Sequence, residues 1–579
     1  MSWKYMFERK TLEMLHAELQ DENRLHRVLG PVSLTALGVG AIIGAGIFAM
    51  TGRVAADDAG PAVILSFAIA GVACMFAALC YAEFAAMAPV AGSAYTYTYA
   101  TLGEILAWII GWDLILEYAM SCSVVAAHWT HYLDEALRTI FNVSIPAVIT
   151  SDPFTKVIVD GQEIQPWVNL PGALAVLFIT WILVIGIKES AVTNAVFVVI
   201  KLAVILIVIG VGAAYVNPTN WTSPSVDARK STNLPDYLHR NPDIAPDVDR
   251  STINGYMTGE EFLQAHPELQ SQLSPVEVNT ISKLPNEAKK WGMLSLLGIK
   301  HYLDPIDEKV RSPFMPYGFS GMMIGAALVF FAYIGFDSIS THAEEATKPQ
   351  RDVPLAILIA LVVCTILYML VSGVITGMEP YYEIDGSAAL ASAFRKQAER
   401  TSNSWLNACA GLIAVGAVAG LTSVILVNFL SQSRIFLAMA RDGLLPHNIF
   451  GVVHPKYRTP HRSTIMTGVC IATVAGFFPI RKLEEMVSIG TLMAFVLVCG
   501  SVMMLRFTNP DAPRPFRCPG LFIIAPLGIL VNLSLMLFLP LDTWFRLFAW
   551  LGLGILIYFS FGMWNSALRK KWVPATEEQ

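Results

Sequence analysis

Runs of apolar residues alternate with short polar segments along almost the whole chain. A helix needs about 20 predominantly apolar residues to cross a bilayer, and more when it is tilted. The runs predict about twelve such helices, at residues 32–51, 61–87, 103–131, 168–187, 191–215, 318–341, 354–378, 405–438, 463–480, 484–506, 519–540 and 543–566. We therefore expect an all-α polytopic membrane protein.

Composition supports this fold class and narrows the function. The chain is 55% hydrophobic and only 15% charged, and its mean hydropathy is +0.54. The net charge is −6, and no basic tract indicates nucleic acid binding. Most of the eight cysteines lie in or beside apolar runs and none belongs to a C-x-x-C pair, so we expect neither disulfides nor structural zinc.

The polar segments predict which side of the membrane each connection faces. An even number of spans puts both termini on one side, and Lys and Arg are more frequent in the short connections of that side. We therefore expect both termini in the cytoplasm and, without a recognisable targeting segment, a bacterial inner membrane. The expected units are a cytoplasmic segment at 1–31, spans 1–5 at 32–216, an insert at 217–316, spans 6–10 at 317–508, spans 11–12 at 509–567 and a cytoplasmic tail at 568–579.

The insert at 217–316 is much longer than the other connections. Thr258 and Glu261 have the spacing of a capping box, which is a usual start of a helix, and a second apolar periodicity runs from Glu277 to Leu303. We predict a small, partly helical extracytoplasmic cap. Because loops of this length are either functional or disordered, a disordered insertion without a role is the alternative.

The stretch from Gly38 to Phe48, in the middle of the first span, is rich in glycine and makes a poor continuous helix. An interruption near Gly44 to Gly46 would expose amides at the start of the next half-helix, where a carboxylate finds donors and a favourable dipole end. The alternative is that Gly40 and Gly44 form a G-x-x-x-G surface for close helix packing.

The sixth span carries a similar signal, because Gly335 is followed two residues later by Asp337. Interruptions in the first and sixth spans are typical of two five-helix repeats of inverted topology, with a central site between the broken helices. This repeat favours the interruption of the first span over the packing surface.

Two ionisable residues lie inside predicted spans. Lys201 lies about ten residues, or roughly 15 Å, into the fifth span, too deep for its side chain to reach the headgroups. A charged lysine there costs at least about 2.5 kcal/mol, so it must face a polar interior or lose its proton. We favour proton coupling over a permanent charge that replaces a bound sodium ion. Glu117, in the third span, could belong to a proton pathway, bind a cationic substrate, or be a protonated acid bonded to backbone.

Other polar residues near the span ends have simpler interpretations. Asp113 is expected near the inner interface, and Glu83 and the segment Pro89–Tyr97 are expected to form a turn with interfacial aromatic residues. His128 is expected to be an interfacial histidine rather than a metal ligand. Nothing resembles a Walker A loop, a nucleophile elbow or a zinc signature, so an enzyme is not supported.

Several motifs resemble the cationic amino acid transporter family of the amino acid–polyamine–organocation (APC) superfamily, especially its bacterial, proton-coupled members. The motifs are Gly38–Phe48, Tyr81–Phe84 with Pro89–Tyr95, Phe331–Asp337 with Glu344–Pro349, and Arg434–Pro446. The resemblance covers essentially all twelve spans, and the insert is the departure from it. It implies a LeuT-like 5+5 inverted repeat followed by two further helices.

The resemblance also implies a substrate site, residue by residue. The substrate carboxylate would meet first-span amides near Ile43, Gly44, Ala45 and Gly46, and the α-ammonium would meet carbonyls of Ile42, Val329, Phe330, Phe331 and Ile334. Phe331 matches an aromatic gate over the substrate, and Leu421 matches a position lining the side-chain pocket. Lys201 matches a lysine that occupies the place of a sodium ion, with first-span carbonyls and Thr422 or Ser423 as neighbours. Glu117 matches an acidic residue typical of the family.

The function implied is a proton-coupled, sodium-independent L-amino acid importer that works by alternating access, with the proton as coupling ion and no other cofactor. Its expected partners are an L-amino acid and membrane lipid but no nucleic acid, and a small single-span protein beside the fifth helix is left open. Leu421 suits substrates with small or apolar side chains, whereas the acidic Glu117 leaves open that the substrate is arginine or lysine. The alternatives are an exchanger without proton coupling and an extracytoplasmic sensor or partner-binding protein built on a transporter fold.

Overall fold

The structure is a computed structural model that describes residues 6–10, 29–44, 46–87, 93–155, 157–159, 162–185, 191–246, 248, 253, 257–286, 290–341, 346–457 and 459–569. Within these residues, eight helices are long and apolar enough to cross a membrane, and three shorter apolar helices accompany them. The predicted fold class, an all-α polytopic membrane protein, is therefore confirmed.

The helices follow the predicted spans closely. The first span consists of α2 (Pro31–Ile42), η2 (Gly46–Met50), α3 (Thr51–Val54) and η3 (Ala55–Ala59), and the sixth of α17 (Gly318–Val329), η9 (Phe330–Tyr333) and α18 (Ser338–Thr341). The others are α4 (Val63–Met87), α6 (Glu104–Phe141), α7 (Leu170–Ile185), α8 (Ala191–Gly212), α19 (Pro349–Met378), α21 (Ser404–Arg441), α22 (His461–Phe477), α23 (Ile480–Thr508), α24 (Leu521–Phe538) and α25 (Leu541–Ile557).

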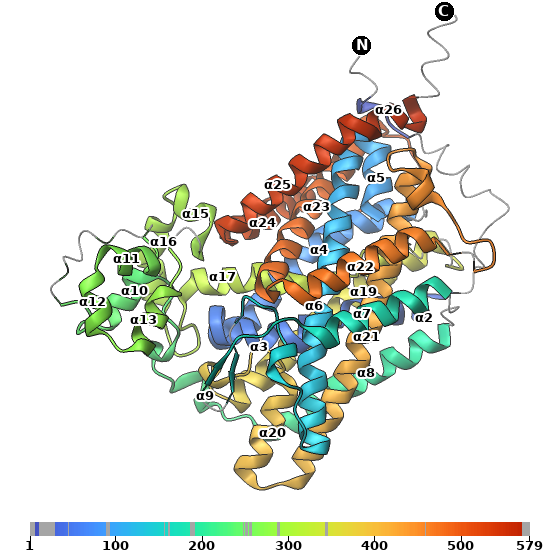
Figure 1. The fold of residues 1–579 in the computed structure, drawn as a ribbon. Coiled ribbons are helices and arrows are strands. Elements are labelled where there is room, and N and C mark those ends of the chain that lie inside the picture. The colour runs from blue at the N-terminus through green and yellow to red at the C-terminus, as the bar shows by residue number, and fades with distance from the viewer. Residues whose placement is uncertain are drawn as a thin grey trace, which may run out of the picture.

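The ends of the described chain meet on one face of this bundle. The Lys10 ammonium lies 3.0 Å from a carboxylate oxygen of Asp442, and the Ala567 amide donates to the Asp442 carbonyl at 2.9 Å. The insert lies at the opposite end of α25, on the other side of the bundle (Figure 1). We call these two sides the terminal face and the insert face.

Both predicted interruptions are present. In the first span, α2 ends at Ile42, Ile43 is extended, and the helix resumes at Gly46. In the sixth, α17 gives way to a 3₁₀ turn, Ile334 is extended, and Gly335 has a φ of +111°. That value favours glycine, because a Cβ is strained in this region.

The insert contains a small helical unit with a core of its own. Its helices are α9 (Thr219–Thr222), α10 (Leu234–Arg240), α11 (Gly259–Ala265), α12 (Pro267–Gln272), α13 (Pro275–Ser282), α15 (Met293–Leu296) and α16 (Lys300–Val310). Leu234, Leu238, Phe262, Leu263 and Ile281 belong to a buried cluster separate from the main core. The capping box predicted at Thr258 is present. The stretch from Glu277 to Leu303, where the sequence shows a second apolar periodicity, contains most of α13, all of α15 and the start of α16.

Several elements were not predicted. The segment expected to be a turn with interfacial aromatic residues contains helix α5 (Ser93–Thr101), whose tyrosines 95, 97 and 99 are buried. A helix, α20 (Ala389–Thr401), and a short hairpin of β1 (Val157–Val159) and β2 (Gln162–Ile164) lie in connections on the insert face. Helix α6 continues ten residues beyond its predicted end, because its polar last turns pack on α20: Arg395 donates to Glu135 at 2.6 Å.

Candidate functional site

The two interrupted segments lie against each other in the middle of the bundle. A Cβ added to Gly46 would lie 2.1 Å from the Cα of Ala332, so this approach is possible only without a side chain at residue 46. The Tyr368 hydroxyl, from α19, lies 2.8 Å from the carbonyl oxygens of both Ile42 and Ala332 and joins the two breaks. Tyr368 was not predicted, because nothing local in a tyrosine within an apolar helix points to such a role.

The predicted substrate residues are gathered at these breaks, and all of those described are buried. They are Ile42, Ile43, Gly44 and Gly46 on the first span, and Val329, Phe330, Phe331 and Ile334 on the sixth; Ala45 lies outside the described residues. Leu421 is also fully buried, on α21. The last carbonyls of a helix and the first amides of the next lack partners within their helices, so the breaks offer acceptors and donors for a zwitterion.

The glycines of the first span also serve close packing. A Cβ on Gly40 would lie 2.4 Å from Val198 on α8, and one on Gly44 would lie 2.8 Å from Val424 on α21. The two interpretations of this stretch are therefore not exclusive. The span is interrupted, and its glycines let neighbouring helices approach the interruption.

Lys201 is buried on α8, with 1% of its surface exposed. Its ammonium donates to the carbonyl of Gly40 at 2.6 Å. Gly40 lies in the last turn of α2, where unpaired carbonyls and the helix dipole favour a positive charge. The Lys201 side chain also passes Gly420 of α21, whose added Cβ would lie 3.1 Å from Lys201 Cγ.

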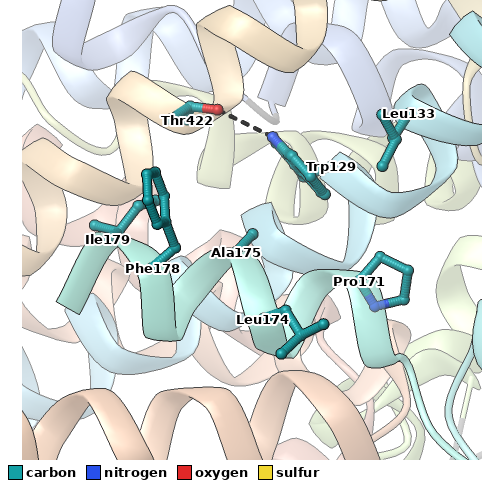
Figure 2. Close-up of a pocket in the computed structure, with 8 residues that line it drawn as sticks. All are labelled: Trp129, Leu133, Pro171, Leu174, Ala175, Phe178, Ile179 and Thr422. Atoms are coloured by element: carbon teal, nitrogen blue, oxygen red, sulfur yellow. Dashed lines mark hydrogen bonds between the residues drawn. The ribbon is translucent and has the colours of Figure 1, made fainter. Parts of the chain in front are cut away.

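The hydroxyls of Thr422 and Ser423 have other partners than the Lys201 ammonium. Thr422 accepts a hydrogen bond from the Trp129 indole at 3.0 Å, as Figure 2 shows, and Ser423 donates to the carbonyl of Gly420. Trp129 and Thr422 border an apolar cavity of about 430 Å³ between α6, α7 and α21. Leu174 and Phe178, which line it, are exposed on α7, and none of the cavity's lining residues belongs to the predicted substrate site.

Glu117 is buried on α6 within a group of acidic side chains. Its carboxyl group lies near Asp113 and Asp337, and near Thr491 of α23. Its Oε2 atom has no hydrogen-bond partner among the described residues. Asp337, which follows the break of the sixth span, accepts a hydrogen bond from Tyr118 at 2.6 Å. In the described part of the chain, Glu117 and Lys201 share no direct contact.

Two acidic residues that were expected near the inner interface are buried in the protein and have partners far away in the sequence. Asp113 is fully buried and faces Gly490 of α23. Glu83 is buried as well, and Arg506 donates to both of its carboxylate oxygens at 2.9 and 2.7 Å. In both cases the partner is more than 300 positions away, which is why the local sequence pattern could not reveal it.

A set of charged side chains, most of them buried, lies at the insert face of the bundle. Arg53, on α3, pairs with Glu484 of α23, which also bonds to His128 at 2.9 Å. His128 is thus a buried histidine with a hydrogen-bond partner. Farther out, Arg481 lies 3.4 Å from Glu485. The one sequence signal for this cluster was a pair of glutamates, Glu484 and Glu485, at the start of an apolar run.

The sequence model of the amino acid permease family matches residues 29–259 and 292–561. The chain is 36% identical to the methylthioribose transporter of Bacillus subtilis (strain 168) over 98% of its length and 99% of that protein. It is 37% identical to the branched-chain amino acid permease BcaP of the same organism, with the same coverage. It is 34% identical to the vacuolar cationic amino acid transporter 4 of Arabidopsis thaliana, over 87% of this chain and 67% of that one. The chain belongs to the amino acid permease family of the APC superfamily and is a membrane transporter of amino acids.

Proposed function

We propose that the chain is a proton-coupled, sodium-independent importer of L-amino acids. The observation that carries this proposal is the hydrogen bond from the buried Lys201 ammonium to Gly40, at the carbonyl end of α2. A protonated Lys201 holds α2 against α8 and stabilises the break of the first span. A neutral lysine loses the charge-assisted part of this bond, so that deprotonation weakens the attachment of α2.

The substrate's backbone groups would be bound by the two breaks. Amides near Gly44 and Gly46 suit the carboxylate, since they lie at the break and at the start of the second half of the first span. The amide of Ile43 already donates to the carbonyl of Val39 at 2.9 Å. The carbonyl of Ile42 suits the α-ammonium even though it accepts from Tyr368, because a carbonyl oxygen has two lone pairs. Phe331 would cover the bound amino acid.

For the side chain, we propose a small or branched apolar group. Leu421 is the residue expected to line that pocket, and a relative of high coverage is named a branched-chain amino acid permease. The buried position of Glu117 beside the acidic Asp113 and Asp337 suits a proton pathway better than a site for a cationic side chain. The name of another relative, a methylthioribose transporter, makes the substrate a point to test directly.

Transport would follow alternating access between two five-helix repeats, with the breaks at their centre. We assign the terminal face to the cytoplasm and the insert face to the outside of a bacterial cell membrane. The excess of Lys and Arg in the short connections of the terminal face supports this orientation. The insert-face charges would hold the site closed from the outside.

The test is uptake of radiolabelled leucine, alanine and arginine into proteoliposomes in sodium-free buffer, with and without an inward proton gradient. In wild type, the gradient should drive accumulation of leucine or alanine above equilibrium. Lys201→Ala should bind substrate but lose this drive. Accumulation that ignores the gradient and depends only on internal amino acid would identify an exchanger and refute proton coupling. Preferential entry of arginine would refute the apolar pocket.

A further inference from the structure

The insert reaches into the charge cluster that closes the insert face. Asp58, in the last turn of the first span, is fully buried and accepts from the Lys290 ammonium at 2.5 Å. Arg481 of α23 lies 3.8 Å from the same carboxylate oxygen. Asp58 is thus held by one cation from the transmembrane bundle and by a second, closer one from the insert.

Lys290 belongs to a stretch of the insert that the family model does not match. The family model matches the chain up to residue 259 and again from residue 292, so Lys290 falls between the two matched parts. Arg481 and Asp58 both lie within the matched parts. The insert therefore adds a cation to an aspartate that the transporter itself already pairs.

The residues that follow Lys290 fix it to helices outside the two interrupted spans. Trp291 and Leu294 are buried in the main core rather than in the core of the insert. A Cβ on Gly292 would lie 1.8 Å from the carbonyl of Leu539, between α24 and α25, so the insert backbone is packed tightly there. Figure 1 shows α15 beside the end of α24. The backbone beside Lys290 is thus held near the end of α24, and the Lys290 ammonium bonds to Asp58 of the first span.

A second contact ties the insert to the first and sixth spans together. The Tyr317 hydroxyl, at the start of α17, donates to the carbonyl of Ala56, and it accepts from the amide of Lys230 in the insert at 3.1 Å. The Lys230 ammonium pairs with Asp57, but both side chains are partly exposed. The exposed pair contributes little because solvent screens it, whereas removing one partner of a buried pair is costly.

We propose that Lys290 is a positioning residue of the outer gate: by pairing with Asp58, the insert holds the outer half of the first span in its closed position. The proposal rests on the alternating-access function proposed above. When the site opens to the outside, the first span must move away from α23, and the Lys290–Asp58 pair must break. The insert then sets how often the gate opens, without touching the substrate.

The experiment measures opening of the gate directly. Thr51, on α3, is fully buried behind the gate, so Thr51→Cys should react with a membrane-impermeant thiol reagent only when the gate opens. The exposed Cys470 is replaced by serine in every variant. Lys290→Ala should increase the rate of modification about tenfold, because Asp58 loses its closer cation. Lys290→Arg should keep the wild-type rate.

The matched control is Lys230→Ala, which removes the exposed pair from the same insert and the same end of the first span. It should change the modification rate less than about twofold. Lys290→Arg keeps the charge in a side chain of different shape, so its wild-type rate is an outcome that a merely structural role of Lys290 would not produce. If Lys290→Ala folds poorly, Lys290→Met removes the same charge but keeps a side chain of similar length.

The outcomes separate this proposal from the proposed function. A rate within twofold of wild type in Lys290→Ala or Lys290→Met, or an equal increase in Lys230→Ala, would overturn the role of Lys290. Normal gradient-driven uptake in the same preparations would then leave the transport proposal intact. If instead wild type ignores the proton gradient while Lys290→Ala still opens the gate, only proton coupling fails.

Discussion

The most direct test of the contact between the two interrupted spans is the substitution Gly46→Ala. The added methyl carbon would lie 2.1 Å from Ala332 Cα and 2.2 Å from its Cβ. Carbon atoms in contact sit about 3.5 Å apart, so the two interrupted segments would have to separate by more than about 1 Å. Overpacking of this kind costs about 1 to 3 kcal/mol. Because the substrate is expected to bind across the contact, its affinity should fall by about 5- to 150-fold.

The assay is equilibrium binding of tritiated leucine to purified protein, with the thermal transition measured on the same samples. Gly210→Ala is the matched control, because Gly210 is also in a membrane-spanning helix and a Cβ there meets nothing within 4 Å. This control should bind as wild type does. Wild-type affinity in Gly46→Ala would refute the reasoning, and so would an equal loss in Gly210→Ala.

Two further predictions concern the substrate cover and the insert. Phe331→Ala should weaken leucine binding by about tenfold or more, since buried aromatic anchors dominate binding, whereas Phe178→Ala, on the exposed side of α7, should leave the measured affinity unchanged. In the insert, burial disfavours the charge of Asp236, but its hydrogen bonds and ion pair with Arg229 outweigh this and lower its pKa. The stabilisation from this ion pair is therefore complete at neutral pH and is lost as the pH falls below about 4. Pepsin should cleave the insert faster at that pH. The variant Asp236→Asn lacks the pair at any pH, so trypsin should already cleave it faster than wild type at pH 7.

The breaks of the first and sixth spans could be predicted because their cause is local. Glycine weakens a helix wherever it occurs, and Gly335 adopts a backbone angle that other residues avoid. The depth of Lys201 could also be predicted, because it follows from counting residues along an apolar run. These two local signals were enough to place the site at the middle of the bundle.

The partners of the buried charges could not be predicted in the same way. Glu83 and Arg506 meet only after the chain has folded, and their separation in sequence carries no pattern. Helices α5 and α20 were missed for a related reason. Their sequences are polar enough to suggest loops, and they are helical because tertiary neighbours cover one side: Tyr95 bonds to Asp442, and Arg395 to Glu135.

The choice of charges for the outer gate follows from what a gate must do. Apolar side chains filling the place of Arg53 and Glu484 would gain about 25 cal/mol for each Å² removed from water and would resist reopening by the same amount. A buried ion pair gains far less net free energy, because the cost of removing both charges from water offsets most of their attraction. When the gate opens, water solvates both charges again. In the gate proposed above, adding Lys290 to Asp58 would shift the balance toward the closed state by an amount small enough for substrate binding and the proposed proton coupling to reverse.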